Sequence, residues 1–461
     1  MEPAAEAGKP LFSGRALVRL MIPLVIEQLL LMTVGMADIM MVTSAGEEVV
    51  SGVSLVDNIN VLLINIMSAL ATGGAVVVAQ YLGRQDRENA GTAAKQLLYV
   101  VTLVALVLMA FALVLRRQIL HLLFGDISAN TMDAAQVYFL LTAAAYPFIA
   151  LYNAGAALFR AMGNSRVSMT NSLIVNLINI AVNAVLIFGF QMGAAGAGIG
   201  TLASRVVGAL IILGMITRPH CPVQLRGLLR PEWRWGMVKT ILGIGVPTGI
   251  ENGMFQIGKL LVLNLVTSFD VGVDLAVKGS AVAANAIANS VASVVNVPGQ
   301  GAGLTLVTVV GQCMGAGDHK QAAGYTRKLI AVTYAAMGTL DVIFFIAMPH
   351  LIPLFQLTLP TAAIAVQVLR WNCVFNAIFW PPSFALPNAL RAAGDAKFTM
   401  VVSMLSMWIC RIGCSYFFGA SWGLGLGLLG VWIGMFCDWI VRGAIFTFHF
   451  VRGKWKNHQV I

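Results

Sequence analysis

The feature that most constrains this chain is an apolar run at residues 21–42, which carries Pro23 and only two acids, Glu27 and Asp38. A helix of about 20 apolar residues spans the hydrocarbon core of a bilayer. A carboxylate inside such a helix costs roughly 2.5–3.5 kcal/mol on insertion scales, so it usually faces a cavity or a partner. Glu27 and Asp38 lie about three turns apart and therefore share one face. The run predicts a membrane helix whose acidic face is turned into the protein.

Further apolar runs of similar length follow along the whole chain, and only 10% of the 461 residues are charged. Soluble globular chains carry about 25% charged residues. We therefore predict an all-α, polytopic membrane protein with twelve transmembrane helices in the lipid bilayer. The predicted spans are residues 17–42, 49–81, 94–115, 133–159, 168–190, 194–217, 238–267, 279–312, 326–348, 362–388, 398–418 and 425–450.

The Lys and Arg residues predict the orientation of these spans. Most of them fall in alternate connections, on the same side as the N-terminus, and only Arg116, Arg117 and Lys278 fall in the other connections. Basic connections stay in the cytoplasm. Both termini are therefore predicted to be cytoplasmic, in the cytoplasmic (plasma) membrane. The net charge of +10 would also suit nucleic acid, but its spread over short loops indicates topology instead, and no nucleic-acid partner is expected.

The sequence repeats itself. VVAQYLGRQDRENA at 77–90 matches VVGQCMGAGDHKQA at 309–322, and ALFRAMGNSRVSM at 157–169 matches NALRAAGDAKFTM at 388–400. The spacing of Pro23 and Glu27 recurs in Pro247 and Glu251. Because each copy holds an even number of spans, the copies enter the membrane in the same sense, with a cavity between them. We predict two pseudo-symmetric six-helix lobes, residues 1–217 and 238–461, around a central cavity and joined by a cytoplasmic amphipathic linker, residues 218–237.

Charged residues inside the spans are unevenly distributed. The first lobe holds three acids and a single base, Arg205, so its carboxylates are expected to lack protein counter-ions and to hold a proton or a cation instead. In the second lobe, Asp438 and Arg442 are four residues apart and are predicted to form an ion pair. The acids are Glu27, Asp38, Asp57, Glu251, Asp341 and Asp438.

The fifth span places Asn176, Asn179 and Asn183 on one polar stripe. Amide oxygens of this kind suit Na⁺, a hard cation that prefers oxygen ligands. The alternative is that the asparagines join helices through hydrogen bonds, each contributing about 1 kcal/mol. The two interpretations are balanced for Asn176, whereas an ion site is favoured for Asn179 and Asn183.

The sequence contains no convincing nucleotide-binding or catalytic motif. The glycines at 193–200 resemble a dinucleotide loop but open a membrane helix, so they indicate close helix packing. The chain contains no P-loop and no serine–histidine–acid set. We expect neither an enzyme nor a cofactor.

Taken together, these segments resemble the multidrug and toxic compound extrusion (MATE) family over essentially the whole chain. The resemblance is carried by Pro23 with Asp38 fifteen residues on, by the repeats at 77–90 and 157–169 with their second copies, and by NLINIAVNAVLIFGFQMGAAGAGIGTLASR across the fifth and sixth spans. It implies two six-helix lobes and export of small organic cations or amphipathic drugs, driven by inward H⁺ or Na⁺. The chain is expected to act as a monomer.

The resemblance also implies an ion-coupling site at Asp38, Asn179, Asn183 and Thr201, which would be the metal ligands if the coupling ion is Na⁺. Many relatives carry an acid in place of Asn183, so the resemblance does not decide whether the coupling ion is H⁺ or Na⁺. Some relatives carry a tenth-span acid where this chain has Asn372 and Asn376. The further candidates for coupling or substrate binding are Glu27, Glu251, Asp57 and Asn176.

The hypothesis from the sequence is that an ion reaching Asp38 from outside repacks the first lobe and releases the drug outward. An alternative is a flippase for a lipid-linked or other amphipathic substrate. Such a flippase is expected to have a strongly cationic cavity and often two additional spans, whereas this chain has twelve predicted spans and an excess of acids in the first lobe. A passive channel would need no coupling carboxylate.

Overall fold

The computed structural model describes residues 10–125, 127–218, 221–223, 225, 232–269, 280–355, 357–458 and 460–461. The start of the predicted N-terminal tail and residues 219–220, 224 and 226–231 of the predicted linker lie outside the described residues. The described chain is helical and contains no strand, which confirms the predicted fold class.

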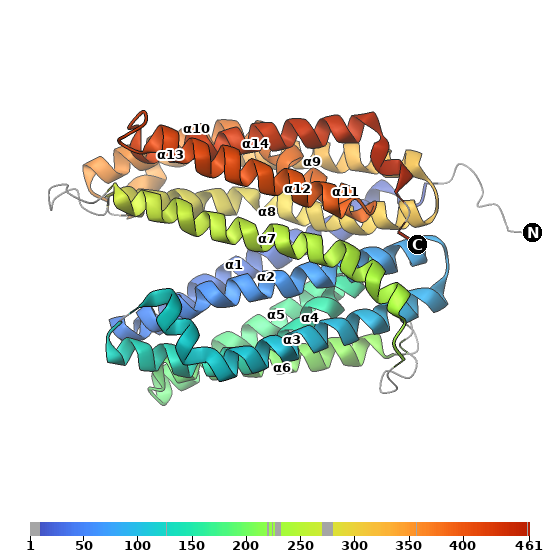
Figure 1. Ribbon diagram of the computed structural model, residues 1–461, viewed down its shortest axis with the longest axis horizontal. Helices are drawn as coiled ribbons and strands as arrows, with labels where there is room; N and C mark the ends of the chain where they lie inside the picture. Colours follow the sequence, from blue (N-terminus) through green and yellow to red (C-terminus); the bar gives the residue numbers. More distant parts are fainter. Residues whose placement is uncertain are drawn as a thin grey trace, which may run out of the picture.

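Helices follow one another with short turns between them (Figure 1). Their bounds are α1 (Gly14–Thr43), α2 (Glu47–Gly83), α3 (Arg87–Phe124), α4 (Ala129–Ala161), α5 (Ser165–Ala184), α6 (Gly193–Ile216), α7 (Trp235–Ser268), α8 (Ser280–Gly315), α9 (His319–Leu351), α10 (Leu359–Trp380), α11 (Leu386–Ala392), α12 (Ala396–Ser406), α13 (Cys414–Gly419) and α14 (Gly427–Arg452). Short 3₁₀ turns lie at η2 (Ile352–Phe355) and η5 (Lys454–Asn457), and π-helical turns at η1 (Val185–Gly189), η3 (Pro381–Ala385) and η4 (Met407–Gly413).

The helices fit a membrane. Within the described residues, eleven helical segments are long and apolar enough to cross a bilayer. The remaining long helix, α7, has 34 residues, which is long enough to cross a bilayer, and includes Glu251 and Lys259. On α3, the side chains of Leu103, Val107 and Phe111 are more than half exposed and follow the helical period, as expected for a face in contact with lipid. The chain is therefore a multi-pass membrane protein.

Each repeated segment at 77–90 and 309–322 forms a turn and a helix cap. Asp86 precedes α3, and its Oδ1 accepts from the backbone N–H of Asn89 at 3.0 Å. Asp318, the matching residue before α9, accepts from the backbone N–H of Gln321 at 2.9 Å. Such caps satisfy N–H groups that have no partner within the helix. They start α3 at Arg87, before the predicted edge at residue 94.

Helices α1–α6, here called the first half, pack mainly on one another. Helices α8–α14 also pack mainly on one another and, together with α7, are here called the second half; α7 itself packs most extensively on α2. In Figure 1 the two groups lie one above the other, with α7 beside α2. Helices α2 and α8 also pack together, as do α1 and α8. The predicted lobe boundaries at 217 and 238 remain predictions.

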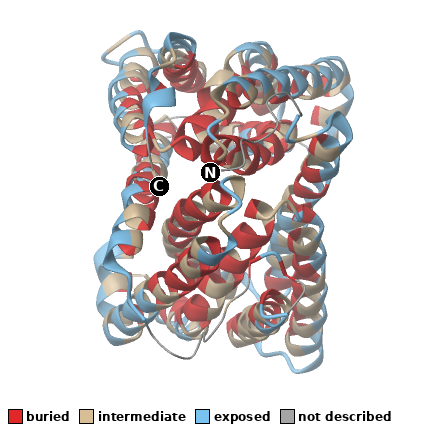
Figure 2. Cartoon of the chain, turned by 90° about the vertical axis from the view of Figure 1, so that its right-hand side faces the viewer, coloured by how far each residue is buried: buried red, intermediate tan, exposed pale blue. Residues whose placement is uncertain are grey.

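The two halves are joined at the end of the molecule that carries both termini, here called the terminus side. The side-chain N–H of Gln80 donates to the carbonyl of Ala392 at 2.8 Å, and that of Gln312 donates to the carbonyl of Ala161 at 2.7 Å. A Cβ atom on Gly83 would overlap the carbonyl oxygen of Gln312 on α8, so α2 and α8 cross backbone against backbone. Seen from this side, buried residues line the inward helix faces (Figure 2). The halves are therefore closed against each other at the terminus side.

Candidate functional site

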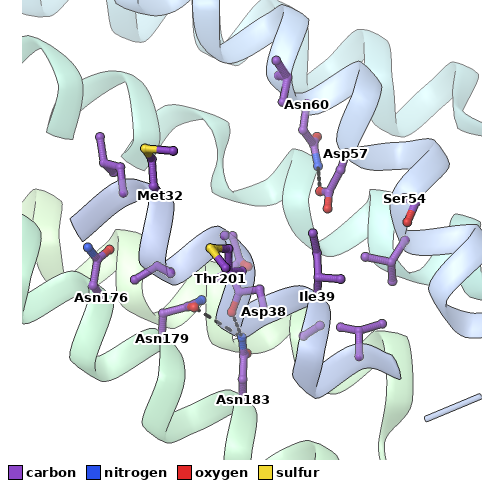
Figure 3. A pocket seen from close by; sticks show the side chains of 18 of the residues that line it. Met32, Asp38, Ile39, Ser54, Asp57, Asn60, Asn176, Asn179, Asn183 and Thr201 are labelled. Atoms are coloured by element: carbon purple, nitrogen blue, oxygen red, sulfur yellow. Dashed lines mark hydrogen bonds between the residues drawn. The ribbon is translucent and has the colours of Figure 1, made fainter. Parts of the chain in front are cut away.

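A pocket of about 810 Å³, here called the first-half pocket, opens among α1, α2, α4, α5 and α6, with α8 and α9 on its border. It is mostly apolar, with two acids, Asp38 and Asp57, and one base, Arg205. The structure brings together the predicted coupling residues Asp38, Asn179, Asn183 and Thr201, and it places Asp57 and Asn176 in the same pocket (Figure 3).

Asp38 is held by amides from α5. Asn183 Nδ2 donates to Asp38 Oδ1 at 2.9 Å. The amide of Asn179 fits in two orientations. In one, its oxygen accepts from Asn183 Nδ2 at 3.3 Å; turned over, its nitrogen donates to both Asp38 oxygens, at 2.8 and 3.2 Å. An ionised carboxylate can only accept hydrogen bonds, so it suits the orientation in which the Asn179 nitrogen faces Asp38. A protonated carboxyl group can donate, so it suits the orientation in which the Asn179 oxygen faces Asp38.

The glycines of α6 let this cluster form. A Cβ atom on Gly200 would overlap Asn183 Oδ1, and one on Gly198 would lie 2.8 Å from the side chain of Leu141. The glycine run therefore provides close helix packing, as predicted from the sequence. Asn183 Oδ1 is buried and has no hydrogen-bond partner among the described residues.

Asp57 accepts hydrogen bonds from neighbouring side chains that the sequence did not predict as its partners. The Tyr138 hydroxyl donates to Asp57 Oδ1 at 3.0 Å, and Asn60 Nδ2 donates to the same oxygen at 3.4 Å. The Tyr146 hydroxyl donates in turn to Asn60 Oδ1 at 2.8 Å. Asn60 and Asp57 are three residues apart on α2, a spacing that could have indicated their contact. Asn176 lines the pocket, and its Nδ2 has no partner among the described residues.

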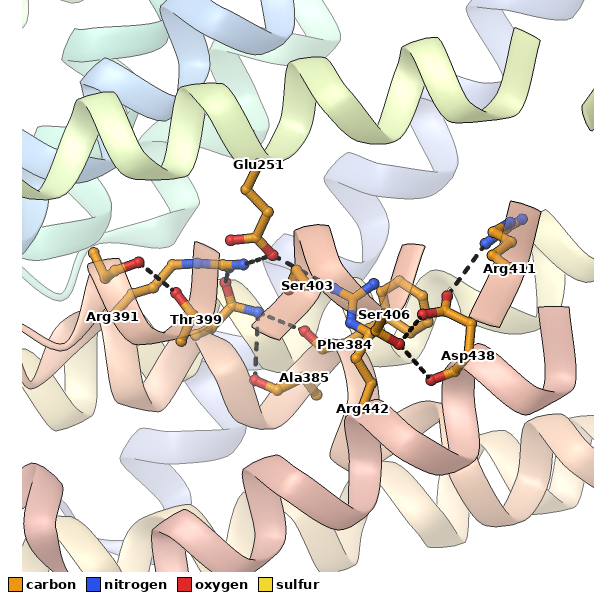
Figure 4. A network of polar contacts seen from close by, with 12 residues as sticks. Glu251, Phe384, Ala385, Arg391, Thr399, Ser403, Ser406, Arg411, Asp438 and Arg442 are labelled. Atoms are coloured by element: carbon orange, nitrogen blue, oxygen red, sulfur yellow. Dashed lines mark hydrogen bonds and ion pairs between the residues drawn. The ribbon is translucent and has the colours of Figure 1, made fainter. Parts of the chain in front are cut away.

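Glu27 and Glu251 are each bound by arginine. Glu27 Oε1 lies 3.3 Å from Arg160 Nη1, and Ser168 donates to Glu27 Oε2 at 2.8 Å. Glu251 Oε1 lies 2.7 Å from Arg391 Nη2 and 3.4 Å from Arg442 Nη2 (Figure 4). The expectation that Glu27 lacks a counter-ion is therefore wrong. Arg160 lies just beyond the predicted span 133–159, but it belongs to the last turn of α4 and its side chain turns into the protein to reach Glu27.

This arrangement is the same in both halves. Glu27 and Glu251 occupy matching positions in the repeat, and so do Arg160 and Arg391. The repeated segments at 157–169 and 388–400 thus each supply a guanidinium to the acid of the first helix in their own half. The two ion pairs are a structural counterpart of the sequence repeat.

The predicted ion pair between Asp438 and Arg442 is wrong. The Ser406 hydroxyl donates to Asp438, whose other carboxylate oxygen lies 3.8 Å from Arg411 Nη1. Arg442 instead contacts Glu251 and donates to Ser403 Oγ at 2.9 Å. Neighbouring helices supply partners with better geometry than the next turn of α14.

A further buried acid meets the tenth-span asparagines. Asn376 Nδ2 donates to the two oxygens of Asp341 at 3.3 and 3.2 Å. Asp341 belongs to α9 and Asn376 to α10, so this contact joins neighbouring helices. Neither the Nδ2 nor the Oδ1 atom of the adjacent Asn372 has a partner among the described residues.

A second cavity of about 640 Å³, here called the central cavity, lies between the halves. Glu27 and Arg160 line it. It shares lining residues with the first-half pocket, namely Leu31, Ile64, Ile149, Arg205 and Ser293. The two spaces are therefore contiguous.

These features agree with a family match. The model of the MatE family matches residues 23–185 and again residues 257–417, once in each half. This chain belongs to the MatE family. The resemblance to MATE proteins found in the sequence is thereby confirmed, and MatE proteins are transporters, not enzymes.

Among curated MatE relatives, the probable multidrug resistance protein NorM of Thermotoga maritima is 27% identical over 97% of this chain and 94% of its own length. The uncharacterized transporter YisQ of Bacillus subtilis is 27% identical over 95% of this chain and 94% of its own length. The solved structure of MATE in complex with MaL6 shares the fold, with a TM-score of 0.87 at 20% identity and 95% coverage of both chains. An outward-facing multidrug resistance MATE transporter shares it with a TM-score of 0.86 at 20% identity, covering 95% of this chain and 96% of that one.

Proposed function

We propose that this protein is a secondary active multidrug efflux transporter, which exports amphipathic compounds carrying a cationic group in exchange for inward H⁺ or Na⁺. The observation that carries the proposal is Asp38, a carboxylate at the wall of a drug-sized pocket whose hydrogen-bond partners, within the described part of the chain, are neutral amides. Curated relatives are described as probable multidrug resistance proteins, which supports the same class of substrate.

Coupling follows from the chemistry around Asp38. When Asp38 takes a proton, its hydroxyl donates to the oxygen of Asn179, and the amide turns over when the proton leaves. For Na⁺, the carboxylate together with the oxygens of Asn179, Asn183 and Thr201 provides the hard ligands that such a cation needs. In both cases the charge at Asp38 is neutralised and its contacts with α5 change.

Exchange requires that the ion and the drug compete. A cationic group in the first-half pocket is attracted by Asp38 and Asp57, and that attraction falls when an ion neutralises Asp38. Transport also needs the two facing states to bind ion and drug with different affinity. The structure is closed at the terminus side by Gln80 and Gln312, so the other facing state requires these contacts to open.

We place both termini in the cytoplasm and the chain in the plasma membrane, because the basic connections lie on the terminus side. Glu27 lines the central cavity and remains a candidate substrate contact. Glu251 lies in a smaller cavity with Arg391 and Arg442, where we assign it a structural ion pair that joins α7 to the rest of the second half.

The experiment is dye transport in proteoliposomes, with H⁺ and Na⁺ gradients imposed separately and rhodamine 123 as the cationic probe. We expect one of the two ion gradients to drive the dye against its concentration gradient. Asp38→Asn should abolish this driven transport, whereas the control Asp133→Asn, on an exposed face of α4, should retain it. Dye movement that is independent of both ion gradients would indicate a passive channel. Normal gradient-driven transport by Asp38→Asn would contradict a coupling role for Asp38.

A further inference from the structure

The wall of the central cavity is basic. Four cationic side chains line it, whereas Glu27 is its only acid among the described residues. Glu27 is already engaged by Arg160 at 3.3 Å, so that ion pair is close to neutral. The other three cations are Arg205, Lys259 and Arg411. The central cavity therefore has a charge opposite to that of the first-half pocket.

Two of these cations flank one aromatic ring. Lys259 Nζ and the guanidinium carbon of Arg411 each lie 5.1 Å from the ring centroid of Phe255. Among the described residues, no acid lies within ion-pair distance of Lys259 or Arg205. The acid nearest to Arg411 is Asp438, at 3.8 Å. Like charges gathered in a partly desolvated space repel each other, and an anion between them relieves that repulsion.

The same wall presents buried donors without acceptors. Arg411 is 8% exposed and Trp439 is 4% exposed, and both line the cavity. Arg411 Nε and Trp439 Nε1 have no hydrogen-bond partner among the described residues. Both groups only donate, so water or a ligand acceptor must satisfy them, and leaving them unsatisfied costs free energy. Arg411 also lies in the π-helical turn η4, and such turns are frequent at functional sites.

Aromatic rings complete the cavity. Trp380 and Phe384 line it as a stacked pair with centroids 5.2 Å apart. The volume of about 640 Å³ falls within the range of small-molecule sites, roughly 300–1,000 Å³. Because Arg205 lines both spaces, one elongated molecule can extend from the acidic pocket into the basic cavity.

We propose that Lys259, Arg411 and Arg205 form a subsite for the anionic group, a carboxylate or phosphate, of an amphipathic substrate. The first-half pocket takes the cationic group of the same molecule, so the preferred substrates are zwitterionic amphiphiles. This inference rests on the proposed function and narrows its substrate class.

The test compares two dyes that differ in one charge. Rhodamine 110 carries a free carboxylate, and rhodamine 123 is its methyl ester. Binding to the full chain is measured by fluorescence polarisation in a neutral detergent. We expect rhodamine 110 to bind about tenfold more tightly, as one charge-assisted hydrogen bond to a desolvated cation provides. Lys259→Met should remove this preference, and Lys239→Met, an exposed lysine on the same helix, should retain it. Arg205→Gln gives a second reduction in the preference.

Equal binding of the two dyes by the unmodified protein, or a preference that survives both Lys259→Met and Arg205→Gln, would overturn the subsite. Gradient-driven transport of rhodamine 123 alongside such a result would leave the proposed function intact, whereas absence of driven transport of either dye would count against the proposed function itself. Competition identifies the source of the anion. Displacement of rhodamine 110 by octanoate supports a soluble substrate, displacement by phosphatidylglycerol supports a lipid headgroup, and displacement by neither contradicts the subsite.

Discussion

Replacing Glu251 by glutamine is expected to destabilise the second half more than the matching change, Glu27→Gln, destabilises the first. Glu251 Oε1 lies within 2.7 Å of Arg391 Nη2 and 3.4 Å of Arg442 Nη2. Glutamine keeps the shape and one acceptor oxygen but removes the charge. Two buried guanidinium groups would then share a neutral partner.

The expected magnitudes follow from burial. The side chains of Arg391 and Arg442 are 11% and 4% exposed. Breaking a buried ion pair costs about 3–5 kcal/mol, and since glutamine keeps an acceptor we expect the lower end, about 3 kcal/mol. Glu27 neutralises one guanidinium at 3.3 Å, on a side chain that is 15% exposed. Arg160 also lines the central cavity and can be hydrated there, so Glu27→Gln should cost about 1 kcal/mol.

The assay is the free energy of unfolding of the purified variants in one detergent, with Glu48→Gln, an exposed acid in the first turn of α2, as the control. The control should change stability by about 0.5 kcal/mol. If Glu27→Gln costs as much as Glu251→Gln, or if Glu251→Gln matches the control, the energetic reasoning about the paired guanidinium groups is refuted.

Three further changes test the fold and the pocket. The leucine side chain of Gly83→Leu would overlap a carbonyl of α8, and such overpacking should destabilise the contact between α2 and α8 by about 1–3 kcal/mol. Maleimide labelling of the buried Cys313 should then rise about tenfold. Unchanged labelling would contradict the close crossing of the two helices. Asp86→Ala removes a helix cap and should cost about 1 kcal/mol of stability. Hydrogen bonds from the side chain and backbone of Asn89 hold the pKa of Asp86 below its usual 3.8. In thermal unfolding, the variant should therefore be less stable than the unmodified protein at neutral pH, and this difference should fade as the pH falls through that lowered pKa. Tyr138→Phe removes the donor 3.0 Å from Asp57 and should cost about 1.5 kcal/mol. That loss should disappear in an Asp57→Ala background, which has no side-chain acceptor, if the hydroxyl acts through the carboxylate.

Apolar runs and repeats were enough to predict the helices, because a segment of some twenty apolar residues has few alternatives to crossing a membrane. Their ends were less accurate. The run at 94–115 belongs to a helix that extends over Arg87–Phe124, since caps such as Asp86 and polar end turns continue helices beyond the hydrocarbon.

Partners across helices were harder to predict. The contact of Asp38 with Asn183 was expected from the polar stripe of the fifth span together with the family resemblance, and not from spacing within one helix. Arg160 looked like a topology signal, because the sequence shows its place at the end of a span but not the direction in which its side chain turns. Arg442 was assigned to the nearest acid on its own helix, although α7 brings Glu251 within reach. The role of Asp38 in ion coupling remains a prediction.

The central claim is that one carboxylate, Asp38, binds the coupling ion and gives it up when the substrate binds. The most direct measurement is ion release on dye binding, made with purified protein in weakly buffered solution, following protons with a pH indicator and Na⁺ with a radioactive tracer. The account predicts that rhodamine 123 releases H⁺ or Na⁺ from the unmodified protein and releases neither from Asp38→Asn. Equal ion release by the two proteins would contradict it.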